Sequence, residues 1–210
     1  MEGKLTEKSC AKFAEALASE APVPGGGGAA ALVGAYGAAL CAMAGNLTIG
    51  KKKYISVKED IRKVLERCAV CQKRLIELAD EDAAVFEPLA QAYSIPKNDP
   101  ERENVLEKMT KQACHAPLEM METCCEVIAV LEEMLEKGNS MLVSDVGCGA
   151  LCSAAALEAA SMNVFVNTRT LRDRVAAKEI EQKADSMLDT YLVRARKVAE
   201  ESMERLRDMR

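Results

Sequence analysis

Hydrophobic residues recur every three to four positions along most of the chain, which is the period of helices that bury one face. Proline and glycine interrupt this pattern and divide it into separate segments. We expect helices at about 6–19, 29–49, 57–86, 100–138, 144–167 and 171–210. Thr6 and Ser144 are the expected N-caps and Gly138 the expected C-cap. Pro88 and the stretch 94–100 should end the third helix, and Pro117 should kink the fourth.

The segment between Ala21 and Gly50 carries no charge, although 29% of the residues in the chain are charged. Such a segment is long enough to span a membrane. Alanine and glycine are only weakly apolar, however, and small residues allow neighbouring backbones to approach closely. We therefore expect a buried helix in a protein without a membrane anchor. The segment 144–167 is equally rich in small residues, which predicts an all-α, single-domain helical bundle over residues 1–210 with two buried Ala/Gly-rich helices.

The amino-acid composition indicates which binding partners and which cellular compartment to expect. The formal net charge is −5, and only 3% of the residues are aromatic, which argues against binding of nucleic acid. The nine cysteines are odd in number, follow no signal peptide and mostly fall at helical core spacing. They predict reduced, buried thiols in a cytoplasmic protein. Cys68 and Cys71, or Cys148 and Cys152, could each supply half a metal site, but His115 completes neither, so we expect no metal.

Asp82 lies on the apolar stripe of the third predicted helix, seven residues after Leu75 and four before Phe86. Asp80 points to the opposite side of the same helix. A carboxylate on a buried face costs several kcal/mol unless it is paired or used in chemistry. Asp82 is therefore either a structural group satisfied by a helix N-terminus or a lysine, or a functional group.

Both ends of the charge-free segment carry groups that bind ligands in other proteins. The run Gly25–Gly28 can present backbone N–H groups, but it follows a helix and lacks the spacing of dinucleotide or phosphate loops. Lys51, Lys52 and Lys53 can bind a carboxylate or can simply form a solvated helix end. The one histidine, His115, lies opposite the apolar stripe of its helix and is expected on the surface. No nucleophile, base and orienting acid are recognisable together.

Several motifs together resemble the C-terminal family of formiminotransferase-cyclodeaminases, which includes stand-alone methenyltetrahydrofolate cyclohydrolases. They follow one another in the family's order over nearly the whole chain: Pro24-Gly-Gly-Gly27, Leu47-Thr-Ile-Gly-Lys-Lys-Lys-Tyr54, Asp80-Glu-Asp-Ala-Ala-Val-Phe86, Ile95-Pro-Lys97, Ala116-Pro-Leu118, Ser144-Asp145, Asn163-Val164 and Asn167. The chain departs from the family at Gly28, where a serine is frequent, and at Asn167-Thr168, which replaces a more common Asn-Leu. Neither side chain is therefore expected to be essential.

The resemblance implies a helical, usually homodimeric folate enzyme that hydrolyses 5,10-methenyltetrahydrofolate to 10-formyltetrahydrofolate without a cofactor. Asp82 is expected to act as general acid and base. Another set of residues is expected to hold the pterin and its neighbours: Pro24, Gly25, Gly26, Gly27, Asn46, Asp145 and Asn163. Lys51, Lys52 and Lys53 are expected to meet the glutamate tail, which can be polyglutamylated.

Two alternatives remain open at this stage. One is formiminotetrahydrofolate cyclodeaminase, which releases ammonia and forms 5,10-methenyltetrahydrofolate. The other is an inactive helical interaction protein, against which Asp82 argues, because leucine at that position would stabilise a purely structural helix. A helix of about 20 residues also separates its ends by roughly 30 Å, too far for one folate monoglutamate to touch both the glycines and the lysines. If both ends bind folate, a dimer could bring one subunit's lysines to the other's glycines.

Overall fold

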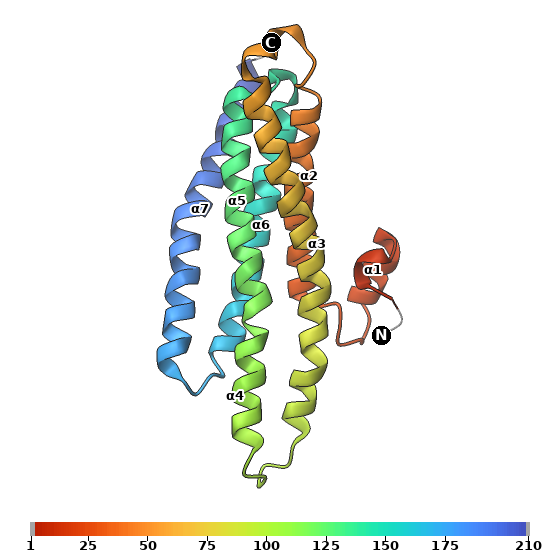
Figure 1. The fold of residues 1–210 in the computed structure, drawn as a ribbon, viewed down its shortest axis with the longest axis vertical. Coiled ribbons are helices and arrows are strands. Elements are labelled where there is room, and N and C mark those ends of the chain that lie inside the picture. Colours follow the sequence, from red (N-terminus) through yellow and green to blue (C-terminus); the bar gives the residue numbers. More distant parts are fainter. Residues whose placement is uncertain (1–2, 209–210) are drawn as a thin grey trace.

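The protein folds into a bundle of long helices (Figure 1). The computed structural model describes residues 3–208, and within that range no strand occurs. The elements in chain order are η1 (Leu5–Glu7), α1 (Cys10–Leu17), α2 (Gly26–Asn46), η2 (Lys52–Val57), α3 (Lys58–Ser94), α4 (Arg102–Ala113), α5 (His115–Lys137), η3 (Ser140–Leu142), α6 (Val143–Thr168) and α7 (Arg174–Asp208). The predicted all-α fold is confirmed.

The two small-residue helices, α2 and α6, pack directly against each other. A β-carbon on Gly37 of α2 would lie 3.0 Å from the backbone oxygen of Gly149 on α6, closer than side chains normally allow. The helices are antiparallel, because Gly26 lies beside Asn163 whereas Gly37 lies beside Gly149 and Ser153. Helix α3 covers another side of α2, and α5 and α7 pack against α6. The close approach explains the abundance of glycine and alanine in both helices.

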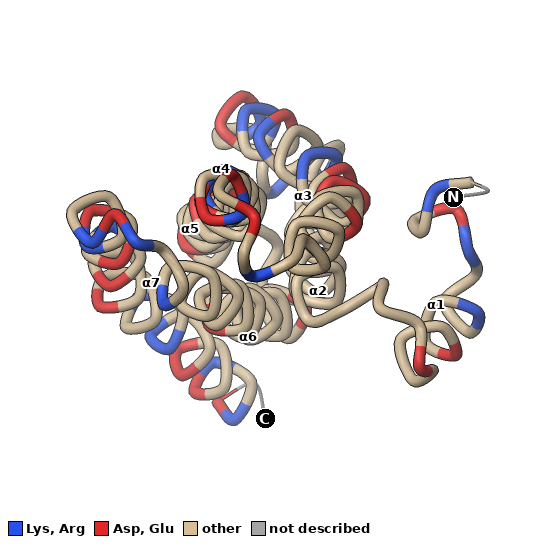
Figure 2. Tube along the Cα trace, turned by 90° about the horizontal axis from the view of Figure 1, so that it is seen from below, with Lys and Arg blue, Asp and Glu red and all other residues tan. Residues whose placement is uncertain are grey.

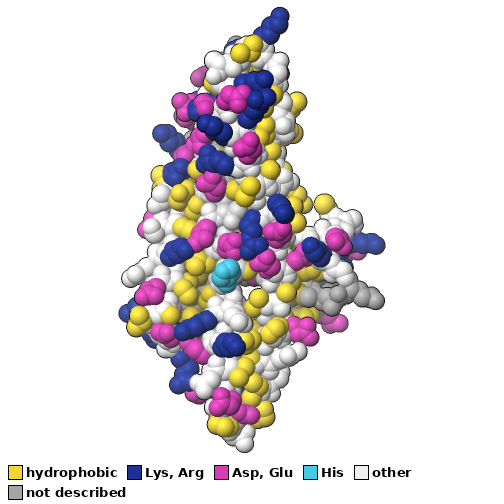
Figure 3. All heavy atoms as spheres, in the orientation of Figure 1, with side chains coloured by type: hydrophobic (Ala, Val, Ile, Leu, Met, Phe, Trp, Pro, Cys, Tyr) yellow, Lys and Arg dark blue, Asp and Glu magenta, His cyan; other side chains and the backbone are white. Residues whose placement is uncertain are grey.

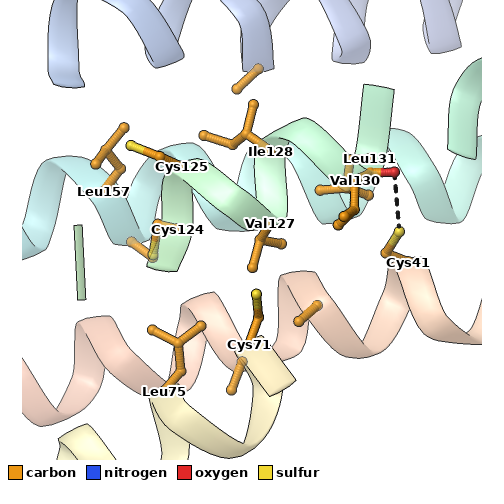
Figure 4. Packing of buried hydrophobic residues seen from close by; sticks show 14 of the residues in the cluster. Cys41, Cys71, Leu75, Cys124, Cys125, Val127, Ile128, Val130, Leu131 and Leu157 are labelled. Atoms are coloured by element: carbon orange, nitrogen blue, oxygen red, sulfur yellow. Dashed lines mark hydrogen bonds between the residues drawn. The ribbon is translucent and has the colours of Figure 1, made fainter. Parts of the chain in front are cut away.

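The main core lies where α2, α3, α5 and α6 meet, and cysteine contributes to it as a small apolar residue (Figure 4). Cys41 donates a hydrogen bond from Sγ to the backbone oxygen of Val130, and Cys71 and Cys124 are buried nearby. All nine cysteines lie in the described residues and are free thiols, although Cys10 and Cys148 are exposed. The prediction of reduced, mostly buried cysteines agrees with this arrangement.

Charged residues gather on the outer helices α3, α4 and α7 (Figure 2). Arg67 on α3 pairs with Glu126 and Glu133 on α5, and Arg194 on α7 pairs with Glu132 on α5. These ion pairs are partly exposed, so they add little stability individually and mainly hold neighbouring helices in register.

Three helices begin at positions that differ from the prediction. The first helix begins at Cys10 with Ser9 as its N-cap, because Thr6 instead donates a 2.6 Å hydrogen bond from Oγ1 to Asp80. The predicted glycine loop is largely helical, since α2 already begins at Gly26. Helix α6 begins at Val143, so the predicted cap Ser144 lies within its first turn.

The α3–α4 region also differs from the prediction. Pro88 does not end α3, which continues to Ser94. Proline removes only one backbone hydrogen bond, and this one lies on an exposed face of the helix, so the helix tolerates it. The predicted fourth helix is two helices, α4 and α5, which meet at Cys114, just before Pro117.

Helices α2 and α6 are long and apolar enough to cross a membrane by length and composition. In this fold both belong to the bundle, and 56% of the apolar window of α2 is buried inside it. Packing between helices therefore accounts for much of the apolar surface that a membrane would otherwise cover.

Candidate active site

A cavity of about 470 Å³ lies at the N-terminal end of α2, between α3 and α6. Its lining comes from the segment before α2, the first turn of α2, the second half of α3, the α4–α5 junction and the end of α6. The lining residues are Pro22, Val23, Gly25, Gly26, Gly27, Asp82, Val85, Phe86, Leu89, Tyr93, Ala113, Ala116, Asn163, Val166, Asn167 and Thr170. Most of this surface is apolar, with Asp82 and Asn163 at the end next to α2 and Asn167 and Thr170 farther along.

Asp82 is the acidic side chain that lines the cavity. Its carboxylate lies against the first turn of α2, where a β-carbon on Gly27 would come within 2.3 Å of Oδ2. Burial raises the pKa of the Asp82 carboxyl above its ordinary value, and a hydrogen bond from the backbone N–H of Gly28 offsets part of that rise. Asp82 thus lies at the N-terminus of a helix and also faces a cavity, so its position is compatible with both sequence-based interpretations.

Asn163 faces Asp82 from the other side of the glycine turn. Its Nδ2 donates a 2.9 Å hydrogen bond to the backbone oxygen of Ala159, which fixes the orientation of the amide. A β-carbon on Gly26 would lie 3.6 Å from Nδ2, so α2 and Asn163 are in close contact. The first turn of a helix carries N–H groups without partners inside that helix. This end of the cavity therefore combines a carboxylate, an amide and backbone donors.

The rest of the cavity is mostly apolar and was not predicted as part of the site. Phe86, which the sequence pattern places on a buried stripe, is 41% exposed, and Tyr93 is 50% exposed. Both lie on α3 on the same side as Asp82. Asn167 also lines the cavity, with its Nδ2 donating to the backbone oxygen of Ala113. The sequence already contained a hint, because the apolar stripe of α3 continues beyond the buried carboxylate.

The structure does not bring all of the predicted site residues together in one chain. Gly25, Gly26, Gly27, Asp82 and Asn163 line the cavity, and Pro24 is buried next to it. The others lie at the far end of α2 or at the start of the antiparallel α6: Asn46, Lys51, Lys52, Lys53 and Asp145. The length of α2 separates the two groups by roughly 30 Å.

The segment around Lys51–Lys53 is nevertheless held in place by contacts with neighbouring residues. Gly50 adopts a φ of +88°, which favours glycine. The hydroxyl of Tyr54 accepts a 3.2 Å hydrogen bond from the backbone N–H of Ser140 and donates a 3.4 Å bond to Asn139 Oδ1. Lys51, Lys52 and Lys53 themselves are exposed.

Two expectations about other groups can be compared with the fold. His115 lies on the surface, with its side chain 74% exposed, as predicted (Figure 3). Within residues 3–208, no three His, Cys, Asp or Glu side chains are grouped as they would be to hold a metal ion.

Known proteins resemble this chain over most of its length. A methenyltetrahydrofolate cyclohydrolase of Methylorubrum extorquens is 42% identical over 180 residues, which cover 84% of this chain and 86% of that protein. The formimidoyltransferase-cyclodeaminase of Mus musculus is 29% identical over 89% of this chain, which spans only 35% of that longer protein. A crystal structure of formiminotetrahydrofolate cyclodeaminase from Thermotoga maritima superimposes with a TM-score of 0.83 at 26% identity, covering 94% of this chain and 98% of that one.

The family described as formiminotransferase-cyclodeaminase matches residues 9–186, a range that contains the whole lining of the cavity. Together with the identity and coverage of these relatives, this match shows that the chain belongs to the formiminotransferase-cyclodeaminase family.

Proposed function

We propose that this chain hydrolyses 5,10-methenyltetrahydrofolate to 10-formyltetrahydrofolate in folate one-carbon metabolism. The observation that carries the proposal is the carboxylate of Asp82, which faces an otherwise largely apolar cavity and has a raised pKa. The similarity to the cyclohydrolase of Methylorubrum extorquens over most of both chains supports the same choice of reaction. The reaction needs no cofactor, and we place it in the cytoplasm.

Asp82 would move one proton through the reaction. Methenyltetrahydrofolate carries an amidinium cation spread over N5, N10 and the carbon between them. Water adds to that carbon while the carboxylate of Asp82 takes a water proton, which gives a tetrahedral adduct. The protonated carboxyl then returns this proton to N5, the bond from carbon to N5 breaks, and the hydroxyl proton leaves to solvent as the N10-formyl group forms. A raised pKa suits a group that must both accept and return a proton.

The polar end of the cavity suits the pterin. A pterin ring has an edge of hydrogen-bond donors and acceptors, and Asn163 and the backbone N–H groups of Gly25–Gly27 surround the place where it would lie. Because Asn163 is oriented by its bond to Ala159, it would keep its carbonyl oxygen available without rearrangement. The pterin would thus be positioned with N5 toward Asp82.

The second candidate is formiminotetrahydrofolate cyclodeaminase, favoured by the close structural match to the Thermotoga maritima protein. In that reaction N10 attacks the formimino carbon on N5, and ammonia leaves. The tetrahedral carbon lies between the same two nitrogens as in hydrolysis, so Asp82 could protonate the leaving nitrogen from the same position.

An assay with both substrates tests the proposal. Purified protein should accelerate the loss of methenyltetrahydrofolate absorbance over the buffer rate, and it should release little ammonia from formiminotetrahydrofolate. Ammonia release as the dominant reaction would favour the second candidate. Failure to accelerate either reaction would leave an inactive helical protein and would overturn the proposed function.

We also propose that the active form is a homodimer. Helices α2 and α6 expose large apolar side chains along their outer faces, among them Tyr36, Met43, Leu151 and Met162. Where exposed apolar side chains form a continuous patch, that patch is typically an interface. A two-fold axis across the antiparallel helices would bring Lys51–Lys53 of one subunit toward the cavity of the other, where the glutamate tail would need positive charge.

A further inference from the structure

The cavity is a slot between two parallel helical segments. Gly34 of α2 lies near both Leu75 of α3 and Ala156 of α6, while the preceding turns of α2 lie near Asp82 and Asn163. Helix α2 is therefore antiparallel to both neighbours, and α3 and α6 run in the same direction beyond the first turn of α2. The slot extends from the polar end toward the ends of α3 and α6.

One wall of the slot is a single line of side chains on α3. Asp82, Phe86, Leu89 and Tyr93 follow one another at spacings of four, three and four residues, so they share one helical face. At 1.5 Å per residue this line is about 16 Å long. Val166 on α6 and Thr170, just after the end of α6, continue the facing wall beyond Asn163. The α3 wall of the slot therefore changes from a carboxylate at Asp82 to aromatic and aliphatic side chains farther along, whereas the facing wall keeps the polar residues Asn167 and Thr170.

Folding alone does not explain the position of Phe86. The chain has three phenylalanines, all within the described residues: Phe13 is 9% exposed, and Phe165 packs against the main core. Phe86 is 41% exposed and lies one helical turn beyond the carboxylate of Asp82. An aromatic ring exposed inside a cavity gains most from contact with a flat apolar group of a ligand.

We propose that Phe86 packs on the p-aminobenzoyl ring of the folate substrate and that the slot from Phe86 to Tyr93 directs the glutamate tail outward. This inference rests on the proposed function. The β-carbons of residues 82 and 86 are about 5–6 Å apart in a helix. N10, which flanks the reacting carbon, carries the p-aminobenzoyl ring directly. With the reacting carbon at Asp82 and the pterin at the glycines and Asn163, this ring falls beside Phe86.

The assignment of Phe86 makes it a specificity residue for one half of the substrate. Its ring would contact neither the pterin nor the groups that transfer the proton at Asp82. Loss of the ring should therefore weaken binding of intact folate while leaving the chemical step nearly unchanged. The same loss should have little effect on a ligand that lacks the p-aminobenzoylglutamate half.

The experiment compares two unreactive probes, 5-formyltetrahydrofolate and the bare 5-formyl-tetrahydropterin, by titration calorimetry. Phe86→Ala should weaken binding of the folate probe by about tenfold and binding of the pterin probe by less than about twofold. It should also raise KM by a similar factor with kcat nearly unchanged. Phe86→Tyr keeps the ring and should bind both probes as the unsubstituted protein does. Val70→Ala, at a 69% exposed position on the same helix outside the cavity, is the control.

Each result decides a different point. An equal loss for both probes would place Phe86 against the pterin and overturn the assignment, and unchanged binding of the folate probe would remove Phe86 from the binding site. If the unsubstituted protein binds the folate probe but catalyses neither folate reaction, the proposed function fails while a selective Phe86→Ala effect still supports this inference. Melting curves of the variants confirm that the binding changes do not come from unfolding.

Discussion

The carboxylate of Asp82 occupies the space that a side chain on Gly27 would fill. A β-carbon on Gly27 would lie 2.3 Å from Oδ2 and 2.6 Å from Cγ of Asp82. The two residues are far apart in the sequence and come from α2 and α3. Absence of a side chain at Gly27 therefore allows an acidic group to enter the first turn of a helix and to face the cavity at the same time.

Gly27→Ala should displace Asp82 and impair both folding and catalysis. The methyl group would force the carboxylate or the helix to shift, at a cost of about 1–3 kcal/mol. Denaturant unfolding and kcat measure the two effects. Gly28→Ala is the matched control, because a β-carbon there meets its neighbours at 3.6 Å or more and alanine favours a helix. Equal behaviour of the two variants would contradict this account of Gly27.

Asp82→Asn should lower kcat by about 10²–10⁴-fold, the range for loss of a general acid–base group. Asparagine has nearly the same shape and can still accept the hydrogen bond from Gly28, so the fold should survive. Binding of 5-formyltetrahydrofolate should therefore remain measurable by calorimetry. Near-normal turnover in this variant would exclude Asp82 as the acid–base group.

The rate should depend on pH through the same carboxyl. The ionised form must accept the proton from water, and burial raises its pKa. Activity should therefore fall as the pH is lowered through a midpoint above that of an ordinary aspartate. A profile of kcat/KM between about pH 4 and pH 8 measures this midpoint. A flat profile over that range would contradict the assignment.

The free energy of unfolding should change with pH in the direction opposite to that of the rate. Because the folded-state pKa of Asp82 is raised, the native state binds more protons than the unfolded state between the two pKa values. The favourable contribution is fully present below the unfolded-state pKa and is lost as the pH rises through the folded-state pKa. Asp82→Asn should therefore melt at a higher temperature than the unsubstituted protein at neutral pH. This difference should shrink toward about pH 4, and a difference that grows there would contradict the prediction.

Replacing Lys51, Lys52 and Lys53 together by glutamine should weaken binding of the polyglutamylated substrate and leave binding of the monoglutamate nearly unchanged. The lysines lie far from the cavity within one chain, so only a longer tail or a partner subunit could connect them to it. The ratio of KM values for the two substrates measures the effect, which should also diminish at high salt. An equal change for both substrates would argue against a contact with the tail.

Leu151→Glu should separate the proposed dimer. Leu151 is 56% exposed on the outer face of α6 in the single chain. In the proposed dimer this position would be buried, and a charge buried there without a partner would be costly. Sedimentation equilibrium should give half the mass of the unsubstituted protein. Val70→Glu, on α3, should leave the mass unchanged. A fully active monomer would contradict the proposal that the lysines act across the interface.

Several helices could be predicted because their causes are local. The period of apolar residues placed α3, α6 and α7 approximately, and the lack of charge between Ala21 and Gly50 indicated a packed helix. Helix ends were less accurate because they depend on distant partners. Thr6 is a residue type that commonly caps helices, but its hydroxyl donates a hydrogen bond to Asp80, which is 74 residues away in the sequence.

The candidate site was predictable where one residue conflicted with its own helix. Asp82 stood out because a carboxylate on an apolar stripe needs a partner or a role. Phe86 did not stand out, because an aromatic ring on that stripe looks the same whether it enters the core or lines a cavity. The difference depends on the helices that pack around it.

The sequence alone determined the helical period and the two small-residue helices, and it singled out Asp82 as a candidate, since each follows from the free energy of burying particular side chains. Tertiary structure decided which groups meet. The antiparallel packing of α2 brought its glycine end to Asp82 and Asn163, and it left Lys51–Lys53 at the other end of the bundle. Pairing of this kind depends on contacts between distant segments, which local periodicity does not encode.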